Sequence, residues 1–175
     1  MKIQESYISL IHTNGYLEYE KSIGFSDFDR KISRRKYANF AVEYWISAEG
    51  SDSHRLNLER GLVMEFIKHL FSPNSLFPSP EYSKNEQENI MRELISVAKK
   101  PHSLKVIGSY LSDKSLEIRK SFLYDGILII AIDEKFEANE ILFLENSASE
   151  FKIERSEMDA MINEIKEKLS IKGDK

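Results

Sequence analysis

The chain contains no cysteine among its 175 residues. This absence excludes a disulfide-stapled fold, a catalytic thiol and a zinc site with cysteine ligands. Glycine is scarce as well, because the seven glycines are widely spaced and never form a cluster. The glycine-rich loops that hold phosphates in kinases, P-loop NTPases and Rossmann enzymes are therefore missing, as is the Gly-x-Ser-x-Gly motif of serine hydrolases.

Long hydrophobic runs are also missing. The longest uninterrupted apolar run covers only six residues, 127–132, whereas a helix that crosses a bilayer needs about 20. Residues 1–5 contain no apolar core of the length that a signal peptide requires. We therefore expect a cytoplasmic protein that does not contact membranes.

The residues that are present give a globular composition. Hydrophobic residues make up 41% and charged residues 31% of the chain, and ten Phe, eight Tyr and one Trp can fill a substantial core. Three of the four prolines lie in segment 72–83, which is the strongest candidate for a linker. Since the other connections are short, we predict a single α+β domain that covers residues 1–175.

The N-terminal region shows the patterns of β-strands. Residues 6–12 and 16–20 are rich in β-forming residues and flank Asn14-Gly15, a pair that suits the type I′ turn of a hairpin. Residues 38–46 alternate between apolar and more polar side chains, which predicts a strand with one apolar face.

The region after residue 103 is also interpreted mainly as strands, separated at one point by the turn pair Asp125-Gly126. The run 127–132 does not alternate, which is typical of a central strand buried on both faces. The predicted strands are 104–111, 116–124, 127–133, 140–145 and 151–154, and the first two could instead be helical.

Three segments have helical spacing of their apolar residues: 53–70, 84–99 and a C-terminal segment that starts near Ser156 and ends at Gly173. The first two end close to a proline, which cannot continue a helix. Together with the predicted strands, this order of elements indicates an α+β fold in which about three helices pack on a mainly antiparallel sheet.

No constellation of residues in the sequence indicates catalysis. None of the four histidines forms an i, i+4 pair or stands in a known metal-ligand pattern. Glu134, Glu137 and Glu140 lie close together, but they lack the alternating oxygen ligands and the central glycine of a calcium-binding loop. We therefore predict that the protein is not an enzyme, and we expect no catalytic residues, no metal site and no cofactor.

Charge is distributed unevenly along the chain, whose net charge is −4. Residues 30–36 carry five positive charges, whereas eleven acids and five bases between residues 133 and 168 give that region about −6. Such polarity favours a partner that is attracted electrostatically. The pI of about 5.7 and the lack of a nucleic-acid-binding motif argue against direct nucleic-acid binding. The acidic region therefore points to a basic protein as partner.

In overall character the chain resembles the small bacterial immunity proteins that neutralise toxins, including those of contact-dependent growth inhibition systems. The likeness lies in the acidic stretch 133–140 and the acid-rich helix from Ser156. It implies a cytoplasmic protein that occludes the active site of a cognate toxin, here a basic nuclease. The group shares no motif, so no residue roles are carried over. The acidic surface itself makes five residues the expected partner contacts: Asp133, Glu134, Glu137, Glu140 and Glu145.

Two other functions remain open at this stage. A secretion chaperone or similar binding module would expose apolar stripes on the helices 53–70 or 84–99. An enzyme with an unrecognised site would gather His54 or His102 with several carboxylates in a deep pocket. The role of the basic stretch 30–36 and the oligomeric state are not determined by the sequence.

Overall fold

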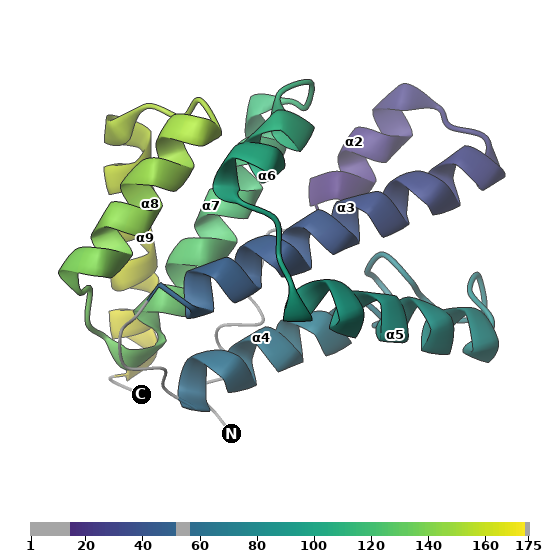
Figure 1. The fold of residues 1–175 in the computed structure, drawn as a ribbon, viewed down its shortest axis with the longest axis horizontal. Coiled ribbons are helices and arrows are strands. Elements are labelled where there is room, and N and C mark those ends of the chain that lie inside the picture. The colour runs from purple at the N-terminus through teal and green to yellow at the C-terminus, as the bar shows by residue number, and fades with distance from the viewer. Residues whose placement is uncertain (1–14, 52–56, 174–175) are drawn as a thin grey trace.

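The computed structural model describes residues 15–51 and 57–173, and every regular element within these ranges is a helix (Figure 1). The elements are α2 (Gly15–Ile23), α3 (Asp27–Glu49), α4 (Asn57–His69), α5 (Lys84–Lys99), α6 (Leu104–Leu111), α7 (Leu116–Ile130), the 3₁₀ turn η1 (Ala131–Asp133), α8 (Ala138–Glu150) and α9 (Arg155–Gly173).

The predicted α+β fold is therefore wrong, because no strand and no sheet occur in the described ranges. The second half of the predicted hairpin lies in α2, whereas residues 6–12 lie outside the described residues. The remaining predicted strands are parts of helices or connections: 38–46 in α3, 104–111 in α6, 116–124 in α7, 127–133 in α7 and η1, 140–145 in α8, and 151–154 between α8 and α9.

Helix α3 explains the error at residues 38–46. The alternation of apolar residues suggested one buried face, but the fully buried set is Tyr37, Ala38, Ala41, Val42, Tyr44, Trp45 and Ala48. The spacing of this set is helical, with neighbours at i+3 and i+4. The apparent period of two arose because aromatic and aliphatic residues cover most of the circumference of this half of α3.

Helix α7 explains the error at the apolar run 127–132. Every residue from 121 to 132 is buried. The expectation of burial on all sides was therefore right, but burial cannot distinguish a central strand from a central helix when the pattern has no period. The pair Asp125-Gly126 likewise lies inside α7 and does not form a turn.

The predicted helix 84–99 is confirmed as α5, and the C-terminal helix is confirmed as α9. Ser83 begins α5 with a capping box, in which its hydroxyl accepts the backbone N–H of Glu86 and Glu86 accepts the backbone N–H of Ser83. Residues 57–69 of the predicted helix 53–70 form α4.

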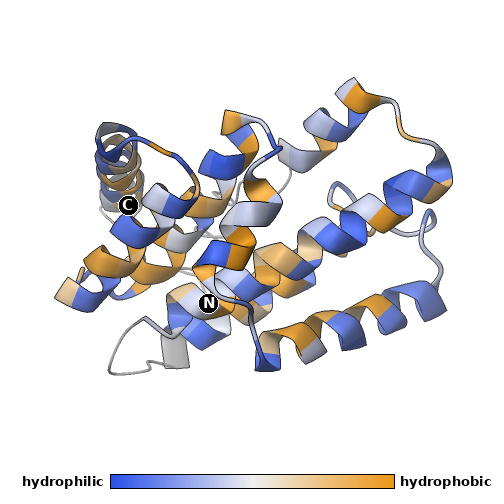
Figure 2. Cartoon of the chain, turned by 45° about the horizontal axis from the view of Figure 1, so that its top comes forward, coloured by the Kyte–Doolittle hydropathy of each residue, from blue (hydrophilic) through white to orange (hydrophobic). Residues whose placement is uncertain are grey.

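The helices pack around α3 and α7. Helix α3 crosses the molecule and contacts α4, α5, α6 and α7, and α7 in turn contacts α2, α4, α8 and α9 (Figure 1). Helices α8 and α9 lie at the opposite end of the molecule from the α2–α3 turn. Hydrophobic and hydrophilic residues alternate around most helices in Figure 2, as expected where each helix buries one side.

The proline-rich segment 72–83 is fixed to this core. The side chains of Leu76, Phe77 and Tyr82 are fully buried, and the rings of Phe77 and Tyr82 meet edge to face. The segment considered as a linker is thus part of the packed structure. None of the helices described is long and apolar enough to cross a membrane.

Gly126 of α7 leaves room for the Tyr44 ring where α3 packs against α7. A Cβ atom at this position would lie 2.6 Å from Tyr44 Oη and 2.8 Å from Tyr44 Cε1. The Tyr44 ring is fully buried and packs against Phe151, so it has little freedom to move away. Gly126 is therefore required by the contact between α3 and α7.

We expect Gly126→Ala to lower the free energy of unfolding by about 1–2 kcal/mol. Overpacking a core costs about 1–3 kcal/mol, and a contact as short as 2.6 Å belongs in the upper part of that range, which exceeds the roughly 1 kcal/mol that alanine gains over glycine in a helix. Gly15→Ala is the control, because its Cβ would lie at an ordinary 3.4 Å from Ser121 Oγ. Denaturant unfolding of both variants is the measurement, and equal stability of Gly126→Ala and the wild type contradicts this packing.

Candidate functional site

The five acidic residues predicted to bind a partner lie around the turn between η1 and α8 and along α8. Asp133 ends η1, and its Oδ1 accepts the backbone N–H of Lys135 at 2.9 Å. Glu134 is exposed and has a positive φ of 63°, so it occupies the left-handed position that ends the turn. These two residues shape the connection as well as carrying charge.

Glu140 has a structural role. Its Oε2 accepts the backbone N–H of Glu137 at 2.7 Å, which closes the first turn of α8, and its side chain is buried. Glu145 is partly exposed and forms an ion pair of 2.7 Å with Arg155 of α9. The structure thus brings Glu134, Glu137 and Glu145 to one end of the molecule with at least partial exposure, whereas Glu140 faces the interior.

The outward face of α8 has few charges. Leu142 is 53% exposed, which is unusual for a large apolar side chain, and it lies on the side of α8 opposite the buried Leu144 and Ser147. The residues that share this exposed side are small or neutral: Ala138, Asn139, Asn146 and Ser149. Two acids lie beside this neutral face: Glu145, and Glu150, which is exposed at the end of the helix. Sequence reasoning overlooked Leu142 because it had assigned the segment to a strand.

The basic stretch 30–36 lies in the first half of α3. Arg34 is buried and forms a two-pronged contact with Glu20 of α2, in which Nε and Nη2 each donate a hydrogen bond of 2.8 Å to the carboxylate. Its Nη1 donates to the carbonyl oxygen of Leu76 at 3.0 Å. Although burial disfavours the charged guanidinium, the bonds to Glu20 and its charge raise the pKa of Arg34 above its ordinary value.

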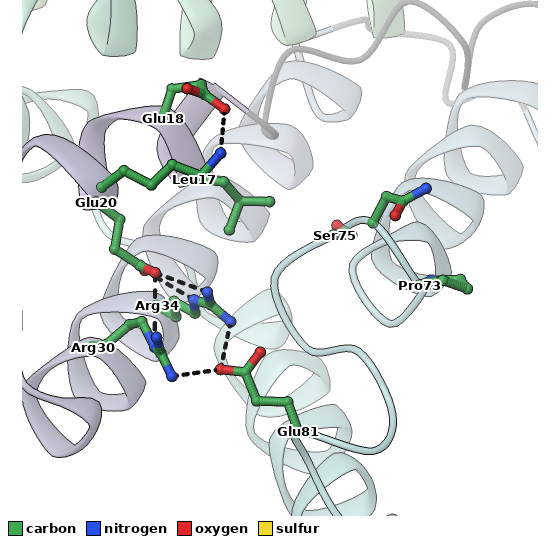
Figure 3. Close-up of a pocket in the computed structure, with 10 residues that line it drawn as sticks. Leu17, Glu18, Glu20, Arg30, Arg34, Pro73, Ser75 and Glu81 are labelled. Carbon is green, nitrogen blue, oxygen red and sulfur yellow. Dashed lines mark hydrogen bonds and ion pairs between the residues drawn. The ribbon is translucent and has the colours of Figure 1, made fainter.

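Arg30 and Glu81 extend this ionic cluster. Arg30 Nη2 lies 3.0 Å from Glu81 and 3.1 Å from Asp27, and Glu81 also lies 3.3 Å from Arg34. The cluster therefore joins α2, α3 and segment 72–83 (Figure 3). We call Glu20, Arg30, Arg34 and Glu81 the α2–α3 ionic cluster.

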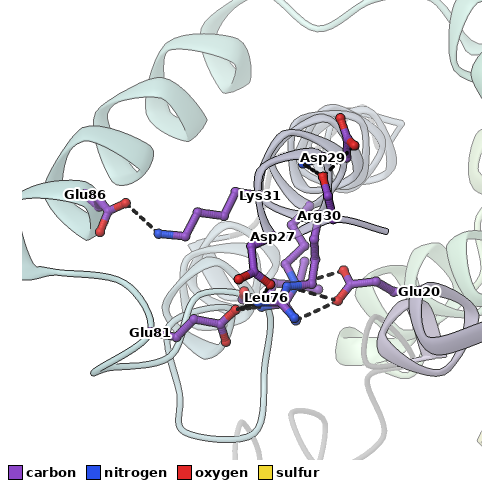
Figure 4. Close-up of polar contacts among 10 residues, drawn as sticks. Glu20, Asp27, Asp29, Arg30, Lys31, Leu76, Glu81 and Glu86 are labelled. Carbon is purple, nitrogen blue, oxygen red and sulfur yellow. Dashed lines mark hydrogen bonds and ion pairs between the residues drawn. The ribbon is translucent and has the colours of Figure 1, made fainter. Parts of the chain in front are cut away.

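A second set of ion pairs joins α3 to α5. Lys31 Nζ lies 2.8 Å from Glu86 (Figure 4), and Arg35 pairs with Glu93. Four of the five positive charges in 30–36, all except Lys36, are therefore matched by carboxylates of α2, α5 and segment 72–83.

A pocket of about 490 Å³ opens beside the α2–α3 ionic cluster (Figure 3). Its lining includes three cationic residues, Lys21, Arg30 and Arg34, and three carboxylates, Glu18, Glu20 and Glu81. Each of the cations contacts one of these carboxylates. The pocket is thus charge-balanced, and its geometry indicates a structural clamp more than a site for a charged substrate.

His102 is held against α3 by Glu43. The buried Glu43 carboxylate accepts the backbone N–H of His102 at 3.0 Å and lies 2.7 Å from its ring Nδ1. This contact fixes the connection between α5 and α6. Burial lowers the pKa of His69 in α4, which favours its neutral form. His12 and His54 lie outside the described residues.

No group of three histidine or carboxylate side chains in the described ranges is arranged to hold a metal ion. Comparison with family models, curated proteins and solved structures finds no match to this chain.

Removal of the buried Arg34 should be costly. We expect Arg34→Met to lower the free energy of unfolding by about 3 kcal/mol, because it leaves the buried Glu20 without its main partner. Arg92→Met is the control, since Arg92 lies 4.0 Å from Glu88 and both side chains are more than half exposed. Exposed pairs contribute about 0–1 kcal/mol. Similar small losses for both variants in denaturant unfolding contradict a buried clamp.

The ion pair between Lys31 of α3 and Glu86 of α5 should make the free energy of unfolding depend on pH in the acidic range. Hydrogen bonds from Lys31 and Ser83 lower the pKa of Glu86 from 4.5 to about 2. Between these values the unfolded chain binds a proton that the folded chain does not, so the contribution of Glu86 to stability is lost as the pH falls from about 4.5 to about 2. We expect a shallower dependence of unfolding free energy on pH in Glu86→Gln and in Lys31→Met. A slope that neither substitution changes rules out this contact.

Proposed function

We propose that this chain is a protein-binding module and that the outward face of α8, with the acidic residues around it, binds a basic partner. The observation that carries the proposal is the exposure of Leu142 on a helix face that is otherwise small and neutral. The centres of protein interfaces are poor in charge and contain a few apolar residues that fill pockets on the partner. Leu142 fits that role.

The charge around this face favours a basic protein. Residues 133–150 contain six acids and one base, which gives a formal charge of −5. Glu134 and Glu150 are exposed, and no ion pair is found for either within the described ranges. Acidic groups at the border of an interface accelerate association with a positively charged partner and do little for the stability of the protein itself.

The specific activity that we propose is neutralisation of a basic toxin, probed most directly as inhibition of a nuclease. Nucleases bind phosphates through a cationic cleft, and carboxylates at fixed positions on a helix can occupy such a cleft. The overall resemblance of the sequence to bacterial immunity proteins supports this proposal. The same face would occlude the cleft sterically, with Leu142 in contact near its centre.

The test uses the full chain as bait in lysate of the native cell. We expect a small basic protein to co-purify, to leave the complex as salt is raised, and to regain nuclease activity once released. Leu142→Lys should lose this partner, because it replaces the apolar contact with a charge that the partner repels.

Ile95→Lys is the matched control, since Ile95 is 40% exposed and its helix, α5, lies away from α8 in Figure 1. It should retain the partner. Equal capture by the wild type and by Leu142→Lys, or a partner that is acidic, overturns the proposal.

A further inference from the structure

Two large apolar side chains are exposed on the first half of α3. Phe28 is 74% exposed and Ile32, one turn further along, is 51% exposed. No other large hydrophobic residue among those described is as exposed as Phe28. Because residues four apart lie on the same side of a helix, Phe28 and Ile32 form one apolar stripe.

Charged residues border this stripe in a particular order. Asp29 lies beside Phe28 and is exposed, on the side of α3 away from the α2–α3 ionic cluster (Figure 4). Lys36 is exposed two turns later, and its ammonium lies 5.7 Å from the ring centroid of Tyr110. Neither Asp29 nor Lys36 has an ion pair in the part of the chain that the structure describes. The Asp29 carboxylate accepts a hydrogen bond of 2.6 Å from the Ser26 hydroxyl, and the pKa of Asp113 is lowered mainly by Lys114 and also by the charge of Lys36. The stripe thus carries an acid at its start and a base at its end, neither of them in a direct ion pair within the described ranges.

We propose that this stripe binds a second copy of the same chain, with the two α3 helices antiparallel and the two-fold axis at Ile32. The proposal is independent of the α8 face, which lies at the other end of the molecule. In such an isologous pair every contact occurs twice. In an antiparallel pair the start of the stripe on one copy faces the end of the stripe on the other copy. The residues at the two ends of the stripe must therefore complement each other.

The order of residues meets this condition. Asp29 lies three residues before Ile32 and Lys36 four residues after it, so antiparallel pairing places Asp29 of each copy opposite Lys36 of the other. Phe28 lies four residues before Ile32 and Arg35 three after it, which places the Phe28 ring beside the Arg35 guanidinium of the other copy. The two Ile32 side chains meet at the axis. Two ion pairs and two ring contacts therefore surround an apolar centre.

The neighbouring contacts keep the stripe in place. Arg35 is held by Glu93 and Lys31 by Glu86, so both are fixed at the edge of the stripe by α5. The Arg35 side chain is still 46% exposed and can therefore also contact a ring of the second copy. The surface is thus ordered before the second copy binds, which limits the entropy lost on association.

The test compares the mass of the full chain over a range of concentrations by sedimentation equilibrium. The wild type should shift from 20.4 kDa towards twice that mass as concentration rises. Ile32→Asp should weaken the dimer by about tenfold or more, whereas Leu142→Asp, an exposed apolar residue on α8, should leave it unchanged. Denaturant unfolding should show that each variant remains folded.

A charge exchange gives the sharper test. In Asp29→Lys a base at position 29 faces the base at position 36 of the other copy, and in Lys36→Asp two acids face each other in the same way. Each variant alone should therefore be monomeric at concentrations where the wild type dimerises. An equimolar mixture of the two should form a heterodimer, because every base then faces an acid. The double variant D29K/K36D should dimerise again.

A wild type that stays at 20.4 kDa up to about 1 mM, where the corresponding binding energy is only about 4 kcal/mol, overturns the proposal. A dimer that persists in Ile32→Asp, or a mixture that does not associate more than its components, also overturns it.

Discussion

The complete burial of residues 121–132 is the constraint on which the rest of the structure depends. A helix that can expose no side chain over this length must be covered on every side, and α2, α3, α4, α8 and α9 provide that cover for α7. Helix α3 packs against α7 at Gly126, where the Tyr44 ring leaves no room for a Cβ atom. The burial of the α7 side chains therefore determines where the outer helices lie, and only the outward faces of those helices remain available for partners.

The ion pairs follow from this arrangement. The C-terminal half of α3 is fixed by its contacts in the core, but the N-terminal half projects beyond them towards the α2–α3 turn. Its basic side chains hold α2, segment 72–83 and α5 to that projecting half through Glu20, Glu81, Glu86 and Glu93. Buried pairs such as Arg34–Glu20 contribute little net energy compared with apolar packing. Their effect here is to specify which elements meet.

Helices with one apolar and one polar side could be predicted from the sequence. Helices that other helices cover on nearly every side could not. Helices α5 and α9 keep a polar side, so their 3.6-residue period is visible, whereas α7 and the second half of α3 have no period to detect. The helix N-caps are a second local signal in the sequence. Serines 26, 83, 103 and 115 each cap a helix by accepting the backbone N–H three residues later. Two of these serines begin the segments 104–111 and 116–124, where helix had remained an alternative to strand.

Charge summed along the sequence is misleading for a similar reason, because it ignores ion pairs between residues that are distant in the sequence. The sum of charges along 30–36 suggested a free basic surface, but four of the five cations contact carboxylates that are distant in sequence. A partner responds to the charges that remain after internal pairing, because a paired carboxylate and base largely cancel each other's field. Charges without an ion pair remain at many exposed positions in the described ranges, Lys84, Lys99 and Lys105 among them. Some of these charges lie near a large exposed apolar side chain, as Asp29 does beside Phe28 and Glu150 at the end of the helix that carries Leu142. Phe28 and Leu142 are the two most exposed large apolar side chains in the described ranges, and exposed apolar area of this kind marks a candidate binding surface more clearly than an unpaired charge does.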